Sequence, residues 1–178
     1  MRTALHFSAS VLVVVVASHA RAEGDAWQRC GALVGNWQAG DRAKPEAGRG
    51  RFSLKFDLDN KVLVRRNHAE LPARAGRGFA QHDDLMVIYR TNEGKDVRAI
   101  YFDSEDHVIH YAVSIGKDDW LVFLGEARAG QPRYRLSYSP EKEHGVRVKF
   151  EIAPPDKPMA FRVYLEGTAS HVNNVEGR

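Results

Sequence analysis

Hydrophobic and polar residues alternate with a period of two over several separate stretches of this chain. The alternation is clearest in residues 51–58, 133–138, 146–152 and 161–166. In a strand, successive side chains point to opposite faces, so this pattern puts the apolar ones on one face, whereas a helix would scatter them. We therefore predict a chain built mainly of strands, each with one buried face and one wetted face.

Turn-forming residues divide the chain into eleven candidate strands, of which residues 76–82 have the weakest pattern. The candidates are 36–40, 49–58, 61–70, 76–82, 84–90, 96–103, 107–115, 119–126, 132–139, 145–152 and 159–169. Most connections are too short for helical crossovers, which favours an antiparallel meander. Only residues 24–34 predict a helix, because Trp27, Cys30 and Val34 recur at helical spacing.

These elements predict an all-β fold, an antiparallel up-and-down β-barrel of about ten strands with one short N-terminal helix. A sandwich is the other arrangement open to such strands. Closure is favoured because tight turns suit pairing between consecutive strands and because a closed sheet has no exposed edges.

The N-terminus predicts a signal peptide over residues 1–22. Arg2 is followed by a short apolar stretch that ends in Ala20-Arg21-Ala22, small residues at the two positions that a signal peptidase reads. Residues 23–178 then form a single domain. The stretch is too short to span a bilayer comfortably, so we predict an exported protein, periplasmic or secreted, without stable membrane insertion.

Charge and cysteine content exclude several classes of partner and scaffold. The formal net charge of +3 falls to +1 in the mature chain, because residues 1–22 hold two basic residues and no acidic ones. With no concentrated basic patch in the sequence, we predict no nucleic-acid binding. One cysteine excludes a disulfide scaffold, and we predict that Cys30 is buried, with intermolecular pairing as the alternative. The protein is expected to be a monomer or homodimer.

Gly35-Asn36-Trp37 opens the first predicted strand directly after the predicted helix. A Gly-x-Trp in this place, followed by a meander, resembles the calycins, the superfamily of lipocalin-like and fatty-acid-binding barrels. It is also similar to small exported bacterial proteins of that type. The resemblance covers the mature chain in pattern and residues 35–37 in motif. It implies that Trp37 plugs the closed end of a barrel whose interior binds a small, mainly hydrophobic molecule.

Haem is an alternative ligand on the same grounds. The chain is also similar to a haem-binding calycin relative, the nitrobindin group, which has ten strands and a histidine ligand near the C-terminus. The similarity implies His171 as the corresponding residue, although residues 35–40 depart from the longer glycine-rich opening of that group. We predict no other cofactor.

Polar residues in phase with the apolar face of a strand are the candidate ligand contacts. In residues 61–70, Val62 and Val64 share a face with Arg66 and His68, which predicts that these two line the interior. A buried arginine is costly unless it is paired, so Arg66 would meet an internal acid or a ligand carboxylate. The alternative is a bulge that turns both residues to solvent.

Aromatic residues complete the predicted ligand-binding set. Tyr89, Tyr101 and Tyr111 are in phase with apolar neighbours and are predicted as wall residues, with His110 facing outward. The ligand-binding prediction therefore comprises Trp37, Arg66, His68, Tyr89, Tyr101 and Tyr111.

Enzyme and metal chemistry find no support in the motifs. The sequence contains no nucleophile elbow, no paired-histidine zinc motif and no phosphate-binding glycine loop, so we predict no catalytic residue. His107 and His110 would point to opposite faces of a strand, and residues 82–84 are read as a solvated turn, so no metal site is predicted. A barrel filled by its own aromatic side chains, with a structural or interaction role, is the alternative to ligand binding.

Overall fold

The computed structural model describes residues 20–40, 48–72, 78–91, 94, 96–141 and 145–172, with side chains from Ala26 onward. The predicted signal peptide lies almost wholly outside these residues, and only its last three residues fall in the first helix. No helix in the described part of the chain is long and apolar enough to cross a membrane.

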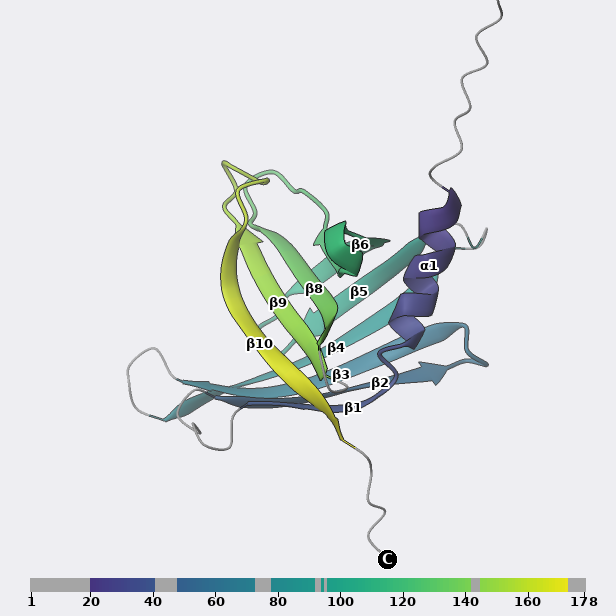
Figure 1. The fold of residues 1–178 in the computed structure, drawn as a ribbon. Coiled ribbons are helices and arrows are strands. Elements are labelled where there is room, and N and C mark those ends of the chain that lie inside the picture. The colour runs from purple at the N-terminus through teal and green to yellow at the C-terminus, as the bar shows by residue number, and fades with distance from the viewer. Residues whose placement is uncertain are drawn as a thin grey trace, which may run out of the picture.

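The described residues form a closed barrel of ten antiparallel strands, each paired with its neighbours in the chain, with β1 and β10 closing the circle (Figure 1). The strands are β1 (Gly35–Ala39), β2 (Arg49–Asp57), β3 (Val62–Pro72), β4 (Phe79–Arg90), β5 (Val97–Asp103), β6 (Val108–Ile115), β7 (Leu121–Gly125), β8 (Arg133–Glu141), β9 (Gly145–Ala153) and β10 (Arg162–Val172). This confirms the predicted all-β, up-and-down barrel.

One strand prediction is wrong. Residues 76–82 and 84–90 are not separate strands, because Phe79–Arg90 pairs without interruption as β4, along β3 from Pro72 to Val62. The His82-Asp83-Asp84 segment therefore lies inside a ladder and is not a solvated turn.

The helix α1 (Ala20–Gly31) lies at one end of the barrel and packs on β5, β6 and β7 (Figure 1). Ala26 and Cys30 lie on the buried face of α1 and are fully covered, and Trp27, also of α1, meets the ring of Phe56 from β2 at 5.9 Å between centroids. We call this end of the barrel the closed end. Burial raises the pKa of the Cys30 thiol to about 12, which makes it a poor nucleophile and confirms the predicted burial.

The Gly-x-Trp motif lies at the start of β1, just after α1, and both of its defining residues have a structural role there. Gly35 has a φ of +138°, which L side chains rarely adopt, and a Cβ there would lie 2.3 Å from Nε2 of His171. Trp37 is buried, its Nε1 donates a hydrogen bond to the Leu33 carbonyl at 2.9 Å, and its ring stacks on Phe52. The tryptophan thereby ties the base of the barrel to the end of the helix.

Candidate functional site

Register decides which side chains of each strand face the barrel interior. Paired residues of antiparallel strands point to the same side of a sheet. Phe56 of β2 pairs with Leu63 of β3, and Leu54 pairs with Arg65. Leu54, Leu63 and Arg65 are buried, so the inward positions of β3 are the odd-numbered ones.

The predicted inward orientation of Arg66 and His68 is therefore wrong. Arg66 is exposed on the outer face, where it pairs with Ser53 and Leu85. His68 lies on the same face, with its Nδ1 at 2.8 Å from the Asp83 carboxylate. Tyr89 also points outward, because it pairs with the outward-facing Val62.

Three of the predicted residues do face the interior. Trp37, Tyr101 and Tyr111 are buried, and the rings of Tyr101 and Tyr111 meet edge to face at 6.3 Å between centroids. His110 faces outward as predicted, since it pairs with the outward-facing Ile100. The role of these three residues in ligand binding stays a prediction.

A charged cluster that the sequence analysis missed lies inside the barrel. Arg65 of β3 forms an ion pair with Asp84 of β4, and the two side chains are only 7% and 4% exposed. Asn67 donates a hydrogen bond from Nδ2 to the other carboxylate oxygen of Asp84 at 2.9 Å. The guanidinium also lies over the ring of Phe52, at 5.3 Å from its centroid.

His82 extends this cluster toward the end of the barrel that lies away from α1. Its Nε2 lies 3.0 Å from the Tyr101 hydroxyl and 3.5 Å from Asp84, and its Nδ1 lies 3.3 Å from Glu105. The hydrogen bond to Asp84, with a further contribution from Glu105, raises the pKa of His82 to about 9. His82 is therefore an imidazolium at neutral pH. We call Arg65, Asn67, His82, Asp84 and Tyr101 the inner cluster.

Two polar atoms beside the inner cluster are buried without a hydrogen-bond partner in the described residues: Nε of Arg65 and the hydroxyl of Tyr138. The hydroxyl lies close to the guanidinium but outside hydrogen-bond geometry. Burial raises the pKa of Tyr138 to about 12, so this hydroxyl keeps its proton at neutral pH. The cluster thus holds hydrogen-bonding capacity that its own side chains leave unused.

Apolar residues on the inner face are on the whole more deeply buried toward α1 than at the opposite end, although Phe56 beside α1 is 38% exposed. Toward α1, the inward residues Leu63, Ile88 and Phe123 are fully buried. At the opposite end, which we call the open end, inward residues are partly exposed. They are Ile109, Tyr134, Val148, Phe150 and Leu165, which we call the open-end wall.

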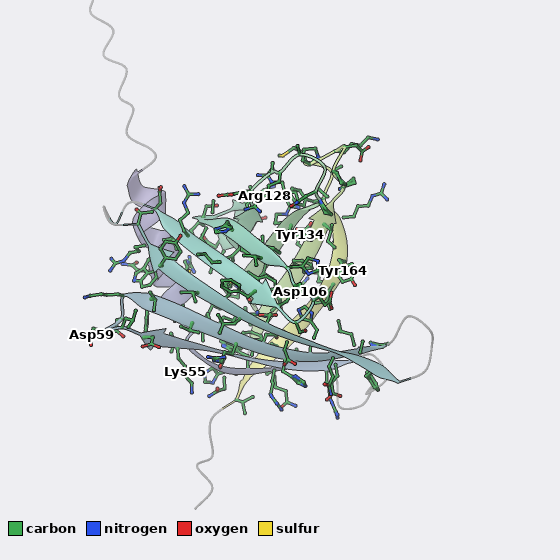
Figure 2. The ribbon with its side chains drawn as sticks, turned by 180° about the vertical axis from the view of Figure 1, so that it is seen from behind. Lys55, Asp59, Asp106, Arg128, Tyr134 and Tyr164 are labelled. Atoms are coloured by element: carbon green, nitrogen blue, oxygen red, sulfur yellow. The ribbon has the colours of Figure 1, made fainter. Side chains whose placement is uncertain are left out.

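Aromatic rings run along this wall. Tyr134 stacks on Phe150 at 6.0 Å between centroids, and Phe150 meets Tyr164 edge to face at 6.2 Å. Figure 2 shows Tyr134 and Tyr164 at the same end of the barrel, far from Asp59 at the closed end. Asp103 lies nearby and takes hydrogen bonds from the backbone N–H groups of Glu105 and His107, which hold its pKa low despite burial.

His171 is the residue implied as a haem ligand, and its surroundings do not fit that role. The residue pairs with Trp37 across β1 and β10, and its ring meets the indole edge to face at 5.1 Å. Its Nε2 lies against Gly35, close to where a Cβ would stand. An iron at this nitrogen would therefore have to displace the histidine from the backbone of β1.

The inward orientation of Arg65 and Asn67, which was not predicted, can be inferred only from the register between β2 and β3. Arg65 and Asn67 are in phase with Leu63, and the partner of Leu63 is the inward Phe56. Knowledge of the β2–β3 turn would have identified them.

The described residues contain no group of three His, Cys, Asp or Glu side chains arranged to hold a metal ion.

Comparison with known proteins adds no relative to this picture. No family model matches the chain, and no curated protein matches it. The ten-stranded closed barrel and the geometry of its interior are thus the grounds on which a function is argued.

Proposed function

We propose that this protein is an exported calycin-like barrel that binds a small, mainly hydrophobic molecule at the open end of its interior. The observation that carries the proposal is the partial exposure of the open-end wall, whose residues point inward yet keep part of their surface accessible to solvent. Inward apolar surface that stays accessible is a feature of ligand sites rather than of filled cores.

The inner cluster supplies the polar side of the proposed site. The positive charges of Arg65 and His82 are matched by Asp84 of the cluster and by the adjoining Glu105, so the cluster and Glu105 together add little net charge. A neutral ligand with one or two hydrogen-bonding groups suits this balance better than a strongly charged one. Trp37, Tyr101 and Tyr111 would then lie on the inner side of the site, between the ligand and the closed end of the barrel.

Binding is tested with a neutral apolar probe, N-phenyl-1-naphthylamine, and with a pair of matched variants. Ile109 and Val108 are consecutive on β6 and face opposite sides of the barrel, inward and outward. We expect Ile109→Gln to weaken probe binding at least tenfold and Val108→Gln to leave it unchanged. Binding is measured by fluorescence titration, with circular dichroism to show that both variants fold.

Native mass spectrometry of the gently purified protein complements this titration by seeking a molecule that co-purifies. Absence of probe binding by the wild type would contradict the proposal and favour the filled barrel with a structural or interaction role. A Phe150→Ala variant provides a second test, should Ile109→Gln fail to fold. Haem is the third possibility, and a Soret band after addition of haem would favour it despite the position of His171.

Export gives a separate prediction. We expect the protein produced in a Gram-negative host to be recovered from the periplasm or medium with Glu23 as its first residue, as measured by intact mass. An Ala22→Arg substitution places a large charged residue at the cleavage position and should block processing. Recovery of both proteins at the mass of the uncleaved chain would contradict the signal peptide.

A further inference from the structure

The outer face of the barrel carries an open groove of about 940 Å³ across β1 to β5. Two rows of register partners flank it. The first row consists of Val172, Asn36, Ser53, Arg66, Leu85 and Phe102, and the second of Gln38, Arg51, His68 and Asp83. Between the rows lies the backbone of inward-facing residues, among them Phe52, Asn67 and Asp84. The groove is therefore separated from the inner cluster by the thickness of the sheet.

Most charges along the groove are already paired with each other. Arg49 pairs with Glu70 at 2.7 Å, and His68 lies 2.8 Å from Asp83. Arg51 is different, because it is exposed and has no ion-pair or hydrogen-bond partner among the described residues. Arg66 is also exposed, and it too has no ion-pair or hydrogen-bond partner among the described residues.

Arg51 and Arg66 are neighbours on the sheet. In the register of β2 and β3, Arg51 lies opposite His68, which is two residues from Arg66. Arg51 and Arg66 are therefore diagonal neighbours, with backbones about 7 Å apart. Long guanidinium side chains at that spacing can converge on one anionic group, and arginine suits the oxygens of phosphate or carboxylate. Ser53 and Gln38 line the same stretch with further hydrogen-bonding groups.

Apolar side chains continue the groove beside Arg66. Leu85 is its register partner on β4, and Phe102 follows on β5 with 42% of its surface exposed. Val172 stands at the other end of the same row and is 38% exposed. The groove thus places two arginines that have no partner among the described residues next to exposed apolar side chains.

We propose that this outer groove is a second binding site, separate from the barrel interior, for amphiphilic anions: a phosphate-type head group bound by Arg51 and Arg66 with a hydrocarbon part lying on Leu85 and Phe102. Charge complementarity selects the head group. The apolar side chains distinguish such a ligand from a simple inorganic ion, which would gain nothing from them.

The test uses n-octyl phosphate below its micellar concentration, with inorganic phosphate and n-octyl glucoside as the two halves of the ligand. We expect octyl phosphate to bind at least tenfold more tightly than either, with affinity falling as NaCl is raised because the head-group contribution is screened. Equal affinity for inorganic phosphate, or for octyl glucoside, would overturn the proposal. Isothermal titration calorimetry provides the measurement.

Matched variants locate the binding. Arg51→Ala and Arg66→Ala should each weaken binding of octyl phosphate at least fivefold, whereas Lys55→Ala, on the same outer face of β2 but outside the groove, should not. All three side chains are exposed, so the variants should fold. If Ile109→Gln abolishes binding and the arginine variants do not, the ligand binds in the interior and the groove proposal is wrong.

A final arm identifies the source of the head group. Co-sedimentation with phosphatidylglycerol vesicles, but not with phosphatidylcholine vesicles, would identify a lipid surface as the source. Binding of octyl phosphate without co-sedimentation would identify a free amphiphile. Either kind of binding supports the outer groove as the site only if Arg66→Ala abolishes that binding. Binding retained in Arg66→Ala would overturn the assignment of the site to the groove.

Discussion

Asp84→Asn is expected to destabilise the protein by about 3–5 kcal/mol, because it leaves the Arg65 guanidinium buried without a counter-charge. Arg65 has only 7% of its side chain exposed and lies deep in the barrel between Leu54 and Met86 of the neighbouring strands. Its Nε has no hydrogen-bond partner in the described residues, so little is left to compensate the charge. Urea unfolding followed by tryptophan fluorescence measures the loss.

The control for this prediction is an exposed ion pair on the same sheet. Arg49 and Glu70 pair at 2.7 Å, but 69% of the Arg49 side chain is exposed, so Glu70→Gln should cost less than about 1 kcal/mol. Replacing both buried partners, as Arg65→Met with Asp84→Leu, should recover at least about half of the loss, since the buried guanidinium charge is removed together with its partner and His82 keeps Glu105. Equal costs for Asp84→Asn and Glu70→Gln would show that the buried pair is not the main source of the effect.

The strands were predictable from sequence because one-sided burial repeats every second residue. Residues 146–152 alternate without exception, and in the structure Val146, Val148 and Phe150 all face inward. Strand limits agree within a few residues wherever a turn signal is present. The separation of β4 into two strands failed because polar residues in the middle of a ladder resemble a turn when their distant partners are unknown.

The inner cluster was not predictable from local pattern, for a physical reason. Val62, Leu63 and Val64 are all apolar, so the start of β3 does not show which face is buried. Its phase is set by the β2–β3 turn, where Leu58, Asp59 and Asn60 all have positive φ. Charged residues that face inward then invert the pattern, because Arg65 stands at an inward position while Val64 faces outward.

The prediction of a solvated turn at residues 82–84 failed for the same physical reason. Asp83 and Asp84 are consecutive and face opposite sides of β4. Asp83 meets His68 on the outside, and Asp84 meets Arg65 on the inside. Each charge is satisfied by a residue more than a dozen positions away, which no local window reveals. Placement of polar residues inside a barrel therefore requires the register first and the chemistry second.

His82 makes the stability of the protein depend on pH in the alkaline range. Its pKa is raised from 6.5 to about 9, first by the hydrogen bond to Asp84 and further by Glu105. A pKa raised by folding contributes stability that is fully present below about pH 6.5 and is lost as pH rises through about 9. With 24% of the side chain exposed, solvent screening reduces the contribution to about 1–2 kcal/mol.

We therefore expect the free energy of unfolding in urea to fall by about 1–2 kcal/mol more between pH 6 and pH 10 for the wild type than for His82→Gln. His110→Gln, on the outer face of β6, serves as the control and should keep the wild-type dependence. Titration of the His82 ring by NMR should show its midpoint near pH 9. A midpoint near 6.5, or the same pH dependence in His82→Gln as in the wild type, would mean that the imidazolium does not stabilise the inner cluster. The charge balance argued for the open end would then lack one of its two cations, and a ligand carrying its own positive charge would become the better fit.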